Sequence, residues 1–340
     1  MHVGIAFDLK ADHPVPANAP DDLFEEFDSP VTVQAIADVL RSAGHTVSEL
    51  GNGKKLLTAL LTSPPDFVFN IAEGTGIGRS REARVPAVCE MLGIPYTGSD
   101  PLTLAVALDK DMTRRIVADA GILLPKGFVL TVPAQPYDGD GAEFAAVLNE
   151  HELTLPVIAK PICEGSSKGI RNRCLIESVE QFGPTVVELW SNYRQAVLVE
   201  EFIAGEEVTI GIVGNDPPTV LGAMRVIPNN PTDKFVYSLE VKRNWEELVT
   251  YECPPKLPVD VLERLERAAL EAYAAVGCRD IARIDFRIRD GQPYFIEVNP
   301  LPGVNPISSD LILISKAMGV SHSDLIHRIF DAAVARQQVP

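Results

Sequence analysis

The sequence predicts a fold of the α/β (α+β) class, in which a parallel βαβ domain comes before further sheets. Two observations predict this class. Short apolar runs alternate with helical stretches through the first 107 residues, as they do in parallel βαβ domains. Apolar and polar residues alternate from 281 to 299 on both sides of an Asp-Gly pair, as in an antiparallel hairpin. With 340 residues, the chain is long enough for two or three domains.

Composition excludes several classes of partner. The chain carries 30 basic and 47 acidic residues, a net charge of −17, which argues against nucleic acid or an anionic membrane as a partner. No apolar run approaches the roughly 20 residues of a membrane span, and the first residues lack the pattern of a signal peptide, so we expect a cytoplasmic protein. The 5 cysteines show no CxxC spacing, so they predict neither a disulfide framework nor a zinc site.

The N-terminal elements follow from apolar runs and from helix start and stop residues. We expect strands at 2–7 and 66–71, and a helix at 30–43 that begins after Ser29. A glycine-rich turn follows at 73–78. It lacks the GxGxxG spacing and the acidic residue of a dinucleotide site, so we expect it to approach a substrate closely through its backbone.

The later elements are predicted in the same way. Lys160 ends a continuously apolar strand, a place where a charge is usually functional, although a surface lysine is the alternative. The polar loop 164–169 could fold over phosphates, and we expect it to be mobile without ligand because it lacks apolar anchors. The other expected strands are 94–98, 127–131, 155–160, 196–202, 207–213 and 219–227; the helices are 101–108, 109–120, one ending near 150 after a loop at 133–141, 258–276, 309–318 and 323–336.

The hairpin pattern also predicts a register. A two-residue turn at Asp290-Gly291 would set the apolar residues of one strand against the polar residues of the other. We therefore expect a three-residue loop at 289–291 with glycine in the left-handed conformation. Arg283 would then face Glu297 directly, with Asp285 diagonal to it.

The polar face of this hairpin predicts a metal site. Asp285, Glu297 and Asn299 offer two carboxylates and an amide oxygen, which suit Mg²⁺ because this ion leaves its other positions to phosphate oxygens and water. A solvated sheet face with a surface ion pair is the alternative. The following segment, NPLPGVN, could aim backbone amides at an anion.

Taken together, the motifs resemble the ATP-grasp ligases and, within them, the D-alanine:D-alanine ligase family. The resemblance covers nearly the whole chain. It implies a three-domain ATP-grasp architecture: an N-terminal βαβ substrate domain at 1–107, a central domain at 108–190 and a catalytic domain at 191–340, with ATP between the last two. The motifs are FNIAEG (69–74), IPYTGS (94–99), ALDK (107–110), Lys160-Pro161, GSSKG (165–169), VEEFIAGEE (199–207), ARIDFR (282–287) and FIEVNPLPG (295–303).

The resemblance also implies roles for individual residues. For ATP, the resemblance implies that Lys110 and Lys160 bind the phosphates and that Glu207 binds the ribose. It implies that Glu200, Phe202 and Ile203 bind the adenine. Glu201 stands where the family often has lysine. For the metal, the resemblance implies two Mg²⁺ ions, or Mn²⁺ in their place, on Asp285, Glu297 and Asn299. For the chemistry, it implies phosphoryl-transfer assistance by Lys242, oxyanion donation by Arg283 and the amide of Gly303, and substrate contacts by Ser166 and Ser308.

The sequence departs from the family where the first substrate would bind. The glutamate expected soon after the first strand is absent, and Glu25 or Glu26 is expected to replace it. Glu73 stands in place of a histidine, and Arg243 in place of a tyrosine. These changes predict a more negative pocket that favours a cationic group; the alternative is a plain D-alanine:D-alanine ligase with solvated glutamates.

The resemblance implies an ATP-dependent ligase that joins two amino acids through an acyl phosphate and releases ADP and phosphate. A ligase of the same chemistry with another amino acid or amine is one alternative. A non-catalytic ATP-binding sensor or scaffold is another, and a kinase is a weaker one. The oxyanion residue Arg283 favours the enzyme, because a protein that only binds nucleotide does not need it. We expect small-molecule partners and leave a homodimer open.

Overall fold

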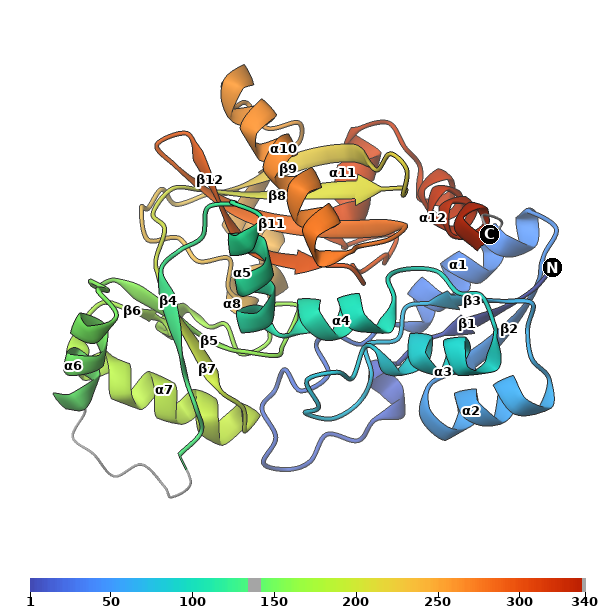
Figure 1. Cartoon of the computed structure of the whole chain (residues 1–340), viewed down its shortest axis with the longest axis horizontal. Coiled ribbons are helices and arrows are strands. Elements are labelled where there is room, and N and C mark those ends of the chain that lie inside the picture. Colours follow the sequence, from blue (N-terminus) through green and yellow to red (C-terminus); the bar gives the residue numbers. More distant parts are fainter. Residues whose placement is uncertain (134–141, 338–340) are drawn as a thin grey trace.

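The computed structural model describes residues 1–133 and 142–337, which form three sheets with helices around them (Figure 1). The predicted loop at 133–141 lies outside the described residues apart from its first position. The strand orders are β2-β1-β3, β4-β7-β5-β6 and β10-β9-β8-β11-β12. The mixture of one parallel and two antiparallel sheets confirms the predicted α/β (α+β) class.

The N-terminal sheet is parallel, with β1 (His2–Ala6) between β2 (Thr46–Gly51) and β3 (Phe67–Asn70). Helix α1 (Pro30–Ser42) packs on one face, and α2 (Gly53–Thr62) and α3 (Arg84–Leu92) pack on the other. The strand predicted at 94–98 is only a single bridge between Val68 and Tyr96, so that prediction is wrong.

The middle sheet is antiparallel and consists of β4 (Gly127–Leu130), β7 (Val197–Glu201), β5 (Val157–Pro161) and β6 (Leu175–Ile176). Helices α6 (Ala142–Glu150) and α7 (Val179–Tyr193) cover it. Strand β7 comes after residue 191, where we expected the third domain to begin, yet it pairs with β4 and β5. The domain limits stay a prediction. Because β7 belongs to the middle sheet, that sheet extends to Glu201.

The C-terminal sheet is also antiparallel, and helices cover both of its faces. Helices α4 (Pro101–Leu108), α5 (Lys110–Asp119) and α10 (Val259–Val276) pack on one face, and α11 (Asp310–Ala317) and α12 (His322–Gln337) pack on the other. Its strands are β8 (Glu206–Val213), β9 (Thr219–Pro228), β10 (Val249–Glu252), β11 (Ile281–Arg289) and β12 (Gln292–Asn299). Short helical turns are η1 (Lys10–Asp12), η2 (Asn172–Cys174), α8 (Leu239–Arg243) and α9 (Trp245–Leu248).

The hairpin β11–β12 turns at Asp290-Gly291, so the predicted three-residue loop is wrong. Arg289 pairs with Gln292, and the two turn residues have φ angles of 53° and 70°. This is the left-handed pair that a two-residue type I′ turn requires, and its twist matches that of the flanking strands. The Asp-Gly sequence therefore decided the loop length more strongly than the apolar pattern did.

The extra residue lies in the strand instead. A bulge at Ile296 shifts the register, so that Asp285 pairs with Glu297 directly and not diagonally. Arg283 pairs with Asn299, which corrects its predicted pairing with Glu297. The prediction that the two carboxylates share one face is confirmed. The alternation of apolar and polar residues correctly indicated one extra residue, but it did not show whether that residue lies in the loop or in a strand.

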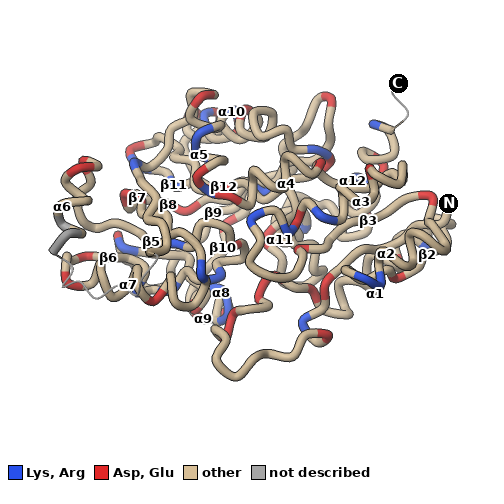
Figure 2. Tube along the Cα trace, turned by 60° about the horizontal axis from the view of Figure 1, so that its bottom comes forward, with Lys and Arg blue, Asp and Glu red and all other residues tan. Residues whose placement is uncertain are grey.

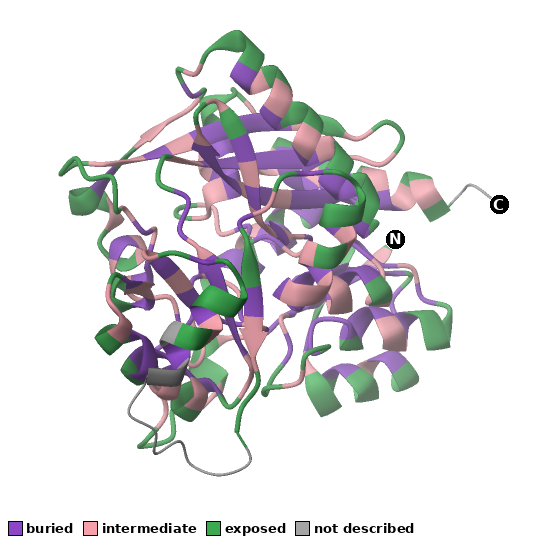
Figure 3. Ribbon diagram, turned by 60° about the vertical axis from the view of Figure 1, so that its left-hand side comes forward, coloured by how far each residue is buried: buried purple, intermediate pink, exposed green. Residues whose placement is uncertain are grey.

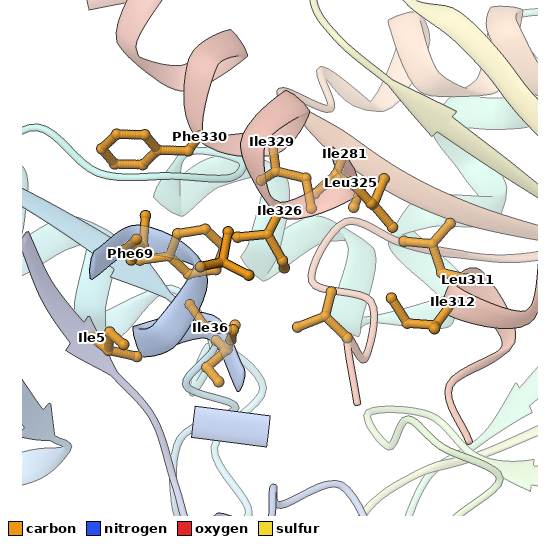
Figure 4. Packing of buried hydrophobic residues seen from close by; sticks show 14 of the residues in the cluster. Ile5, Ile36, Phe69, Ile281, Leu311, Ile312, Leu325, Ile326, Ile329 and Phe330 are labelled. Carbon is orange, nitrogen blue, oxygen red and sulfur yellow. The ribbon is translucent and has the colours of Figure 1, made fainter. Parts of the chain in front are cut away.

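One core joins the N-terminal sheet to the C-terminal helices (Figure 4). Helix α12 packs against α1, and its Phe330 contacts the ring of Phe67, with ring centroids 5.1 Å apart. Figure 3 shows that buried residues follow the strands while exposed residues occupy outward turns of the helices. Because this core is shared, the N-terminal unit depends on the last helix of the chain.

Phe330→Ala is expected to lower the free energy of unfolding by about 3 to 5 kcal/mol, since it removes a large, buried ring from this shared core. Urea denaturation followed by circular dichroism measures the change. Leu61→Ala is the control, because Leu61 is 69% exposed and its loss should matter by no more than about 0.5 kcal/mol. Equal effects of the two substitutions would contradict the shared core.

Candidate active site

Two pockets meet at the polar face of the β11–β12 hairpin. Arg283 and Glu297 line both of them. The first pocket lies between the middle and C-terminal sheets, and the second lies between the N-terminal region and the segment after β12. A group bound in one pocket could therefore react with a group bound in the other at this shared edge.

The first pocket has largely apolar walls with charged groups at one end. Such a pocket suits a flat aromatic ring attached to a charged tail. Its apolar lining includes Ile158, Val226, Phe286 and Ile296. The predicted ATP-binding residues that line it are Lys160, Glu200, Glu201, Phe202, Ile203 and Glu207. Lys110 is the exception among the predicted set, because it lines the second pocket instead.

Lys160 emerges from β5 into this pocket, as its position after an apolar strand predicted. Its ammonium pairs with the buried carboxylate of Glu200, which also pairs with Arg114. The Glu200 carboxylate is thus already occupied by two cations. This pairing fixes Lys160 at the pocket wall, while the sequence had suggested only an adenine contact for Glu200.

Arg287 shapes the first pocket, although the sequence singled it out only as part of a motif. Its guanidinium lies over the ring of Phe202 at 4.8 Å and pairs with Glu207 at 2.8 Å. It also donates to the carbonyl of Ile203 at 2.5 Å. Burial lowers the pKa of Arg287 in spite of Glu207. Glu201 lies at the rim and pairs with Arg289 at 2.6 Å.

The hairpin brings the predicted metal ligands together. The amide of Asn299 lies 3.4 Å from both the Asp285 and the Glu297 carboxylates. Arg283 donates to Asp285 at 2.8 and 3.0 Å, and Thr209 of β8 donates to the same carboxylate. In the described ranges, no group of three His, Cys, Asp or Glu residues could hold a metal ion. A metal here would therefore need further oxygen ligands from a bound molecule.

The charges around this face balance differently at the two carboxylates. Burial raises the pKa of Asp285, and the neighbouring Glu297 adds to this, while Arg283 opposes it. Burial also acts to raise the pKa of Glu297, but Lys110 and Arg283 outweigh it and hold that pKa well below its usual range. Lys110 lies 3.5 Å from Glu297 and donates to the carbonyl of Glu164. Lys242 lines the first pocket, with its ammonium 5.0 Å from the centre of the Tyr237 ring.

A buried ion network, which the sequence did not reveal, closes the second pocket. Arg81 pairs with Glu26 at 2.7 Å and with Glu164 at 3.3 Å, and it donates to the carbonyl of Cys163 at 2.7 Å. Lys168 pairs with Glu164 at 2.7 Å and with Glu26 at 3.7 Å. Burial would raise the pKa of Glu26, but Arg81 and Lys168 lower it below its usual value. We call these residues, Glu26, Arg81, Glu164 and Lys168, the Arg81 network.

The loop 164–169 is held by polar contacts where apolar anchors are lacking. The amide of Gly165 donates to Glu26 at 2.5 Å, and the amide of Gly169 donates to Asp22 at 2.9 Å. Ser166 and Ser167 have φ angles of 49° and 58°, so the backbone makes a left-handed turn that places Ser166 at the second pocket. Polar contacts thus hold the loop where apolar anchors are lacking, and its mobility stays a prediction.

The glycine-rich turn at 73–78 also has a structural explanation. Gly74 has a φ of 78°, and a Cβ there would lie 2.5 Å from the carbonyl oxygen of Arg81. Gly74 therefore makes a close backbone approach to Arg81; an approach of this turn to a substrate stays a prediction. Glu73 itself lines the second pocket, as expected for a substrate residue.

Four further predicted residues, Gly303, Ser308, Glu25 and Glu26, differ in whether they line the second pocket. Gly303 lines the second pocket, but Ser308 is exposed and bonds to Asn305. Glu25 lies outside both pockets and pairs with Arg243 at 2.8 Å, whereas Glu26 lines the second pocket. Of the two candidates for the missing family glutamate, Glu26 therefore has the position that we predicted. Figure 2 shows basic and acidic segments interleaved in the middle of the molecule, around α4, α8 and α11.

Solved structures with the same fold are ligases. A D-alanine–D-alanine ligase from Bacillus anthracis has a TM-score of 0.75 at 22% identity, with 99% of both chains covered. A structure of this ligase complexed with ATP has a TM-score of 0.72 at 23% identity, covering 100% of this chain and 99% of that one. The D-Ala:D-Ser ligase VanG from Enterococcus faecalis has a TM-score of 0.71 at 21% identity, covering 98% and 99%. The likeness shows the ATP-grasp fold.

Comparison with related sequences shows the family to which the chain belongs. The family model for the D-ala D-ala ligase C-terminus matches residues 116–331. D-alanine–D-alanine ligase of Aquifex aeolicus is 33% identical over 87% of this chain and 92% of its own length, and that of Moorella thermoacetica is 32% identical over 88% and 92%. The chain is an ATP-dependent, amide-forming ligase of the ATP-grasp class. It belongs to the D-alanine–D-alanine ligase family. Within the described residues, no helix is long and apolar enough to cross a membrane.

Glu26→Gln is expected to lower the free energy of unfolding by about 3 to 5 kcal/mol, because it leaves Arg81 and Lys168 buried with one partner fewer. Glu25→Gln is the matched control from the next position. It breaks a more exposed pair with Arg243, so about 0 to 1 kcal/mol is expected. Chemical denaturation measures both values. A Glu26→Gln protein as stable as the control would mean that the Arg81 network does not hold these segments together.

Proposed function

We propose that the chain joins two amino acids by the chemistry of D-alanine:D-alanine ligase, with an acyl phosphate as the intermediate. The observation that carries the proposal is the meeting of two unlike pockets at Arg283 and Glu297. One pocket has the apolar walls and lysines that a nucleotide needs, and the other has a mostly polar lining. D-alanine is a leading candidate for one of the two amino acids, because the curated relatives are ligases of that amino acid.

The hairpin face fits two Mg²⁺ ions. The Asp285 and Glu297 carboxylates and the Asn299 amide, whose nitrogen donates to both, converge there. Carboxylate and amide oxygens are the hard ligands that Mg²⁺ prefers, and three protein ligands leave room for phosphate oxygens. When bound, the ions would neutralise phosphate charge. Burial raises the pKa of Asp285, which indicates that the present cations do not fully compensate its charge. A divalent cation would supply that compensation, and Mn²⁺ shares the preference for oxygen.

Lysines and Arg283 supply the remaining positive charge. Lys160 and Lys242 line the first pocket and are placed to contact phosphate oxygens, while Lys110 reaches the same face from the second pocket. Phosphoryl transfer depends mainly on such positioning and charge neutralisation. Arg283, Ser166 and the amide of Gly303 line the second pocket, where they would donate to the oxyanion that forms during amine attack.

The lining of the first pocket supports a binding site for the nucleoside. Phe202 and Ile203 would contact the adenine ring, with Glu200 and Glu201 near its edge, and Glu207 would accept from ribose hydroxyls. Burial raises the pKa of Glu207 although Arg287 opposes this. We place the protein in the cytoplasm, where ATP and free amino acids are available to it. A homodimer stays an open expectation.

Glu297→Gln is expected to lower amino-acid-dependent ADP release by at least about 10²- to 10³-fold, because one electrostatic contact at the reacting groups is typically worth that much. Glu206→Gln is the control, since Glu206 pairs with Arg225 and lines neither pocket. A coupled assay with Mg-ATP and pooled D- and L-amino acids gives the rate, and mass spectrometry gives the product.

Three results would contradict the proposal. Nucleotide binding without any amino-acid-dependent ADP release would favour the sensor or scaffold. ADP release with a phosphorylated amino acid and no amide product would favour the kinase. Full activity of Glu297→Gln would show that the hairpin face is not the reacting site.

A further inference from the structure

We propose that the second pocket selects a first substrate with a second ammonium group, a diamino acid, through an acidic wall formed by Asp28, Glu73 and Glu82. All three carboxylates line this pocket, and no ion pair holds any of them in the described part of the chain. The inference rests on the proposed ligase function and names the substrate class for it.

The other carboxylates of the pocket already have cations. Glu26 and Glu164 are matched by Arg81 and Lys168 in the Arg81 network. Glu297 is matched by Lys110 at 3.5 Å and by Arg283 at 3.7 Å. These pairings use the cations that lie nearest to the pocket. The acidic wall is therefore the part of the lining whose charge the protein does not balance.

Glu82 is the strongest member of the acidic wall. It is 7% exposed, lines the pocket, and has neither an ion pair nor a side-chain hydrogen bond within the described residues. A buried carboxylate without a partner is costly, so a protein keeps one mainly where a ligand completes it. Glu73 shares this lack of a partner and is only half-buried. Asp28 comes from the same N-terminal segment as Glu26 and bonds to Thr32.

The titration of the acidic wall agrees with a missing cation. Burial, together with the charges of Glu26 and Glu164, raises the pKa of Glu82 to about 8, although Arg81 and Lys110 oppose this. Burial and Glu82 raise the pKa of Glu73 well above its usual value. Burial, aided by Asp8, raises the pKa of Asp28 to about 7. A bound ammonium would favour the charged forms of all three.

One α-ammonium is too little charge for this wall. An amino acid such as D-alanine brings a single positive charge, and its carboxylate would be drawn toward the amide of Gly303 and toward Arg283, which also lines the first pocket. That leaves at least two of the three acids without a cation, so that their raised pKa values keep them protonated. A second ammonium on the side chain supplies the missing charge and three more hydrogen-bond donors.

The test compares substrate pairs that differ only in whether an ammonium or a methyl group ends the side chain: ornithine with norleucine, and 2,4-diaminobutyrate with norvaline. Each is supplied as both enantiomers with Mg-ATP and D-alanine, and kcat/KM is measured by ADP release with mass spectrometry of the product. We expect the diamino acid to be favoured by at least about 10-fold, as charge-assisted contacts imply.

Glu82→Gln and Glu73→Gln are expected to reduce this preference by about 10- to 100-fold, measured as the ratio of kcat/KM within each pair. Glu49→Gln, an exposed carboxylate of the same N-terminal sheet, is the matched control and should not change the ratio. Thermal unfolding without ligand is a second readout. Glu82→Gln should raise the Tm at pH 7, because the raised pKa of Glu82 makes the native protein take up a proton that the unfolded chain releases, and the amide removes that cost. A purely structural glutamate would lower the Tm on substitution.

Calorimetry with a non-hydrolysable ATP analogue separates this inference from the ligase function. Tighter binding of ornithine than of norleucine, without ligation of any amino acid, would support the acidic wall and remove the ligase proposal. Efficient ligation of D-alanine with no preference within the pairs would keep the ligase and overturn the acidic wall. A preference that Glu82→Gln and Glu73→Gln both leave unchanged would also overturn it.

Discussion

The site depends on the ion pairs that the buried guanidinium of Arg81 makes. This guanidinium ties three segments that are far apart in the sequence: the N-terminal loop through Glu26, its own loop after β3, and the loop 164–169 through Glu164. The entropy of ordering these polar loops is not offset by apolar burial, so ion pairs in a low-dielectric interior must offset it. Because these same segments form the wall of the second pocket, the network sets the shape of that pocket.

The hairpin β11–β12 provides the polar residues that would take part in the reaction. A stiff antiparallel pair at one edge of a five-stranded sheet holds Arg283, Asp285, Glu297 and Asn299 on one face, while Phe286 and Phe295 fill the core behind them. The reacting groups thus lie on rigid strands, and the substrate-selecting groups lie on loops clamped by ions. This division separates the groups proposed for the reaction from the groups proposed to select the first substrate.

Much of the fold could be predicted from the sequence, because strand alternation and helix caps are local signals. The shared face of Asp285 and Glu297 and the emergence of Lys160 from β5 both followed from such patterns. The bulge at Ile296 did not, since an extra residue in a strand and one in a loop give the same parity. Arg81 and Glu82 were missed because they lie in an irregular polar stretch, where only tertiary contacts distinguish a buried charge from a solvated one.

The central claim is that a bound amino acid's carboxylate takes the γ-phosphoryl group of ATP where the two pockets meet. Incubation with Mg-ATP and an amino acid labelled with ¹⁸O in its carboxylate, together with the second amino acid, tests this directly by mass spectrometry of the released phosphate. The claim predicts one ¹⁸O atom in each phosphate, because the acyl phosphate keeps its bridging oxygen on phosphorus when the amine attacks. Phosphate without the label would mean that water attacks ATP, and it would contradict the account.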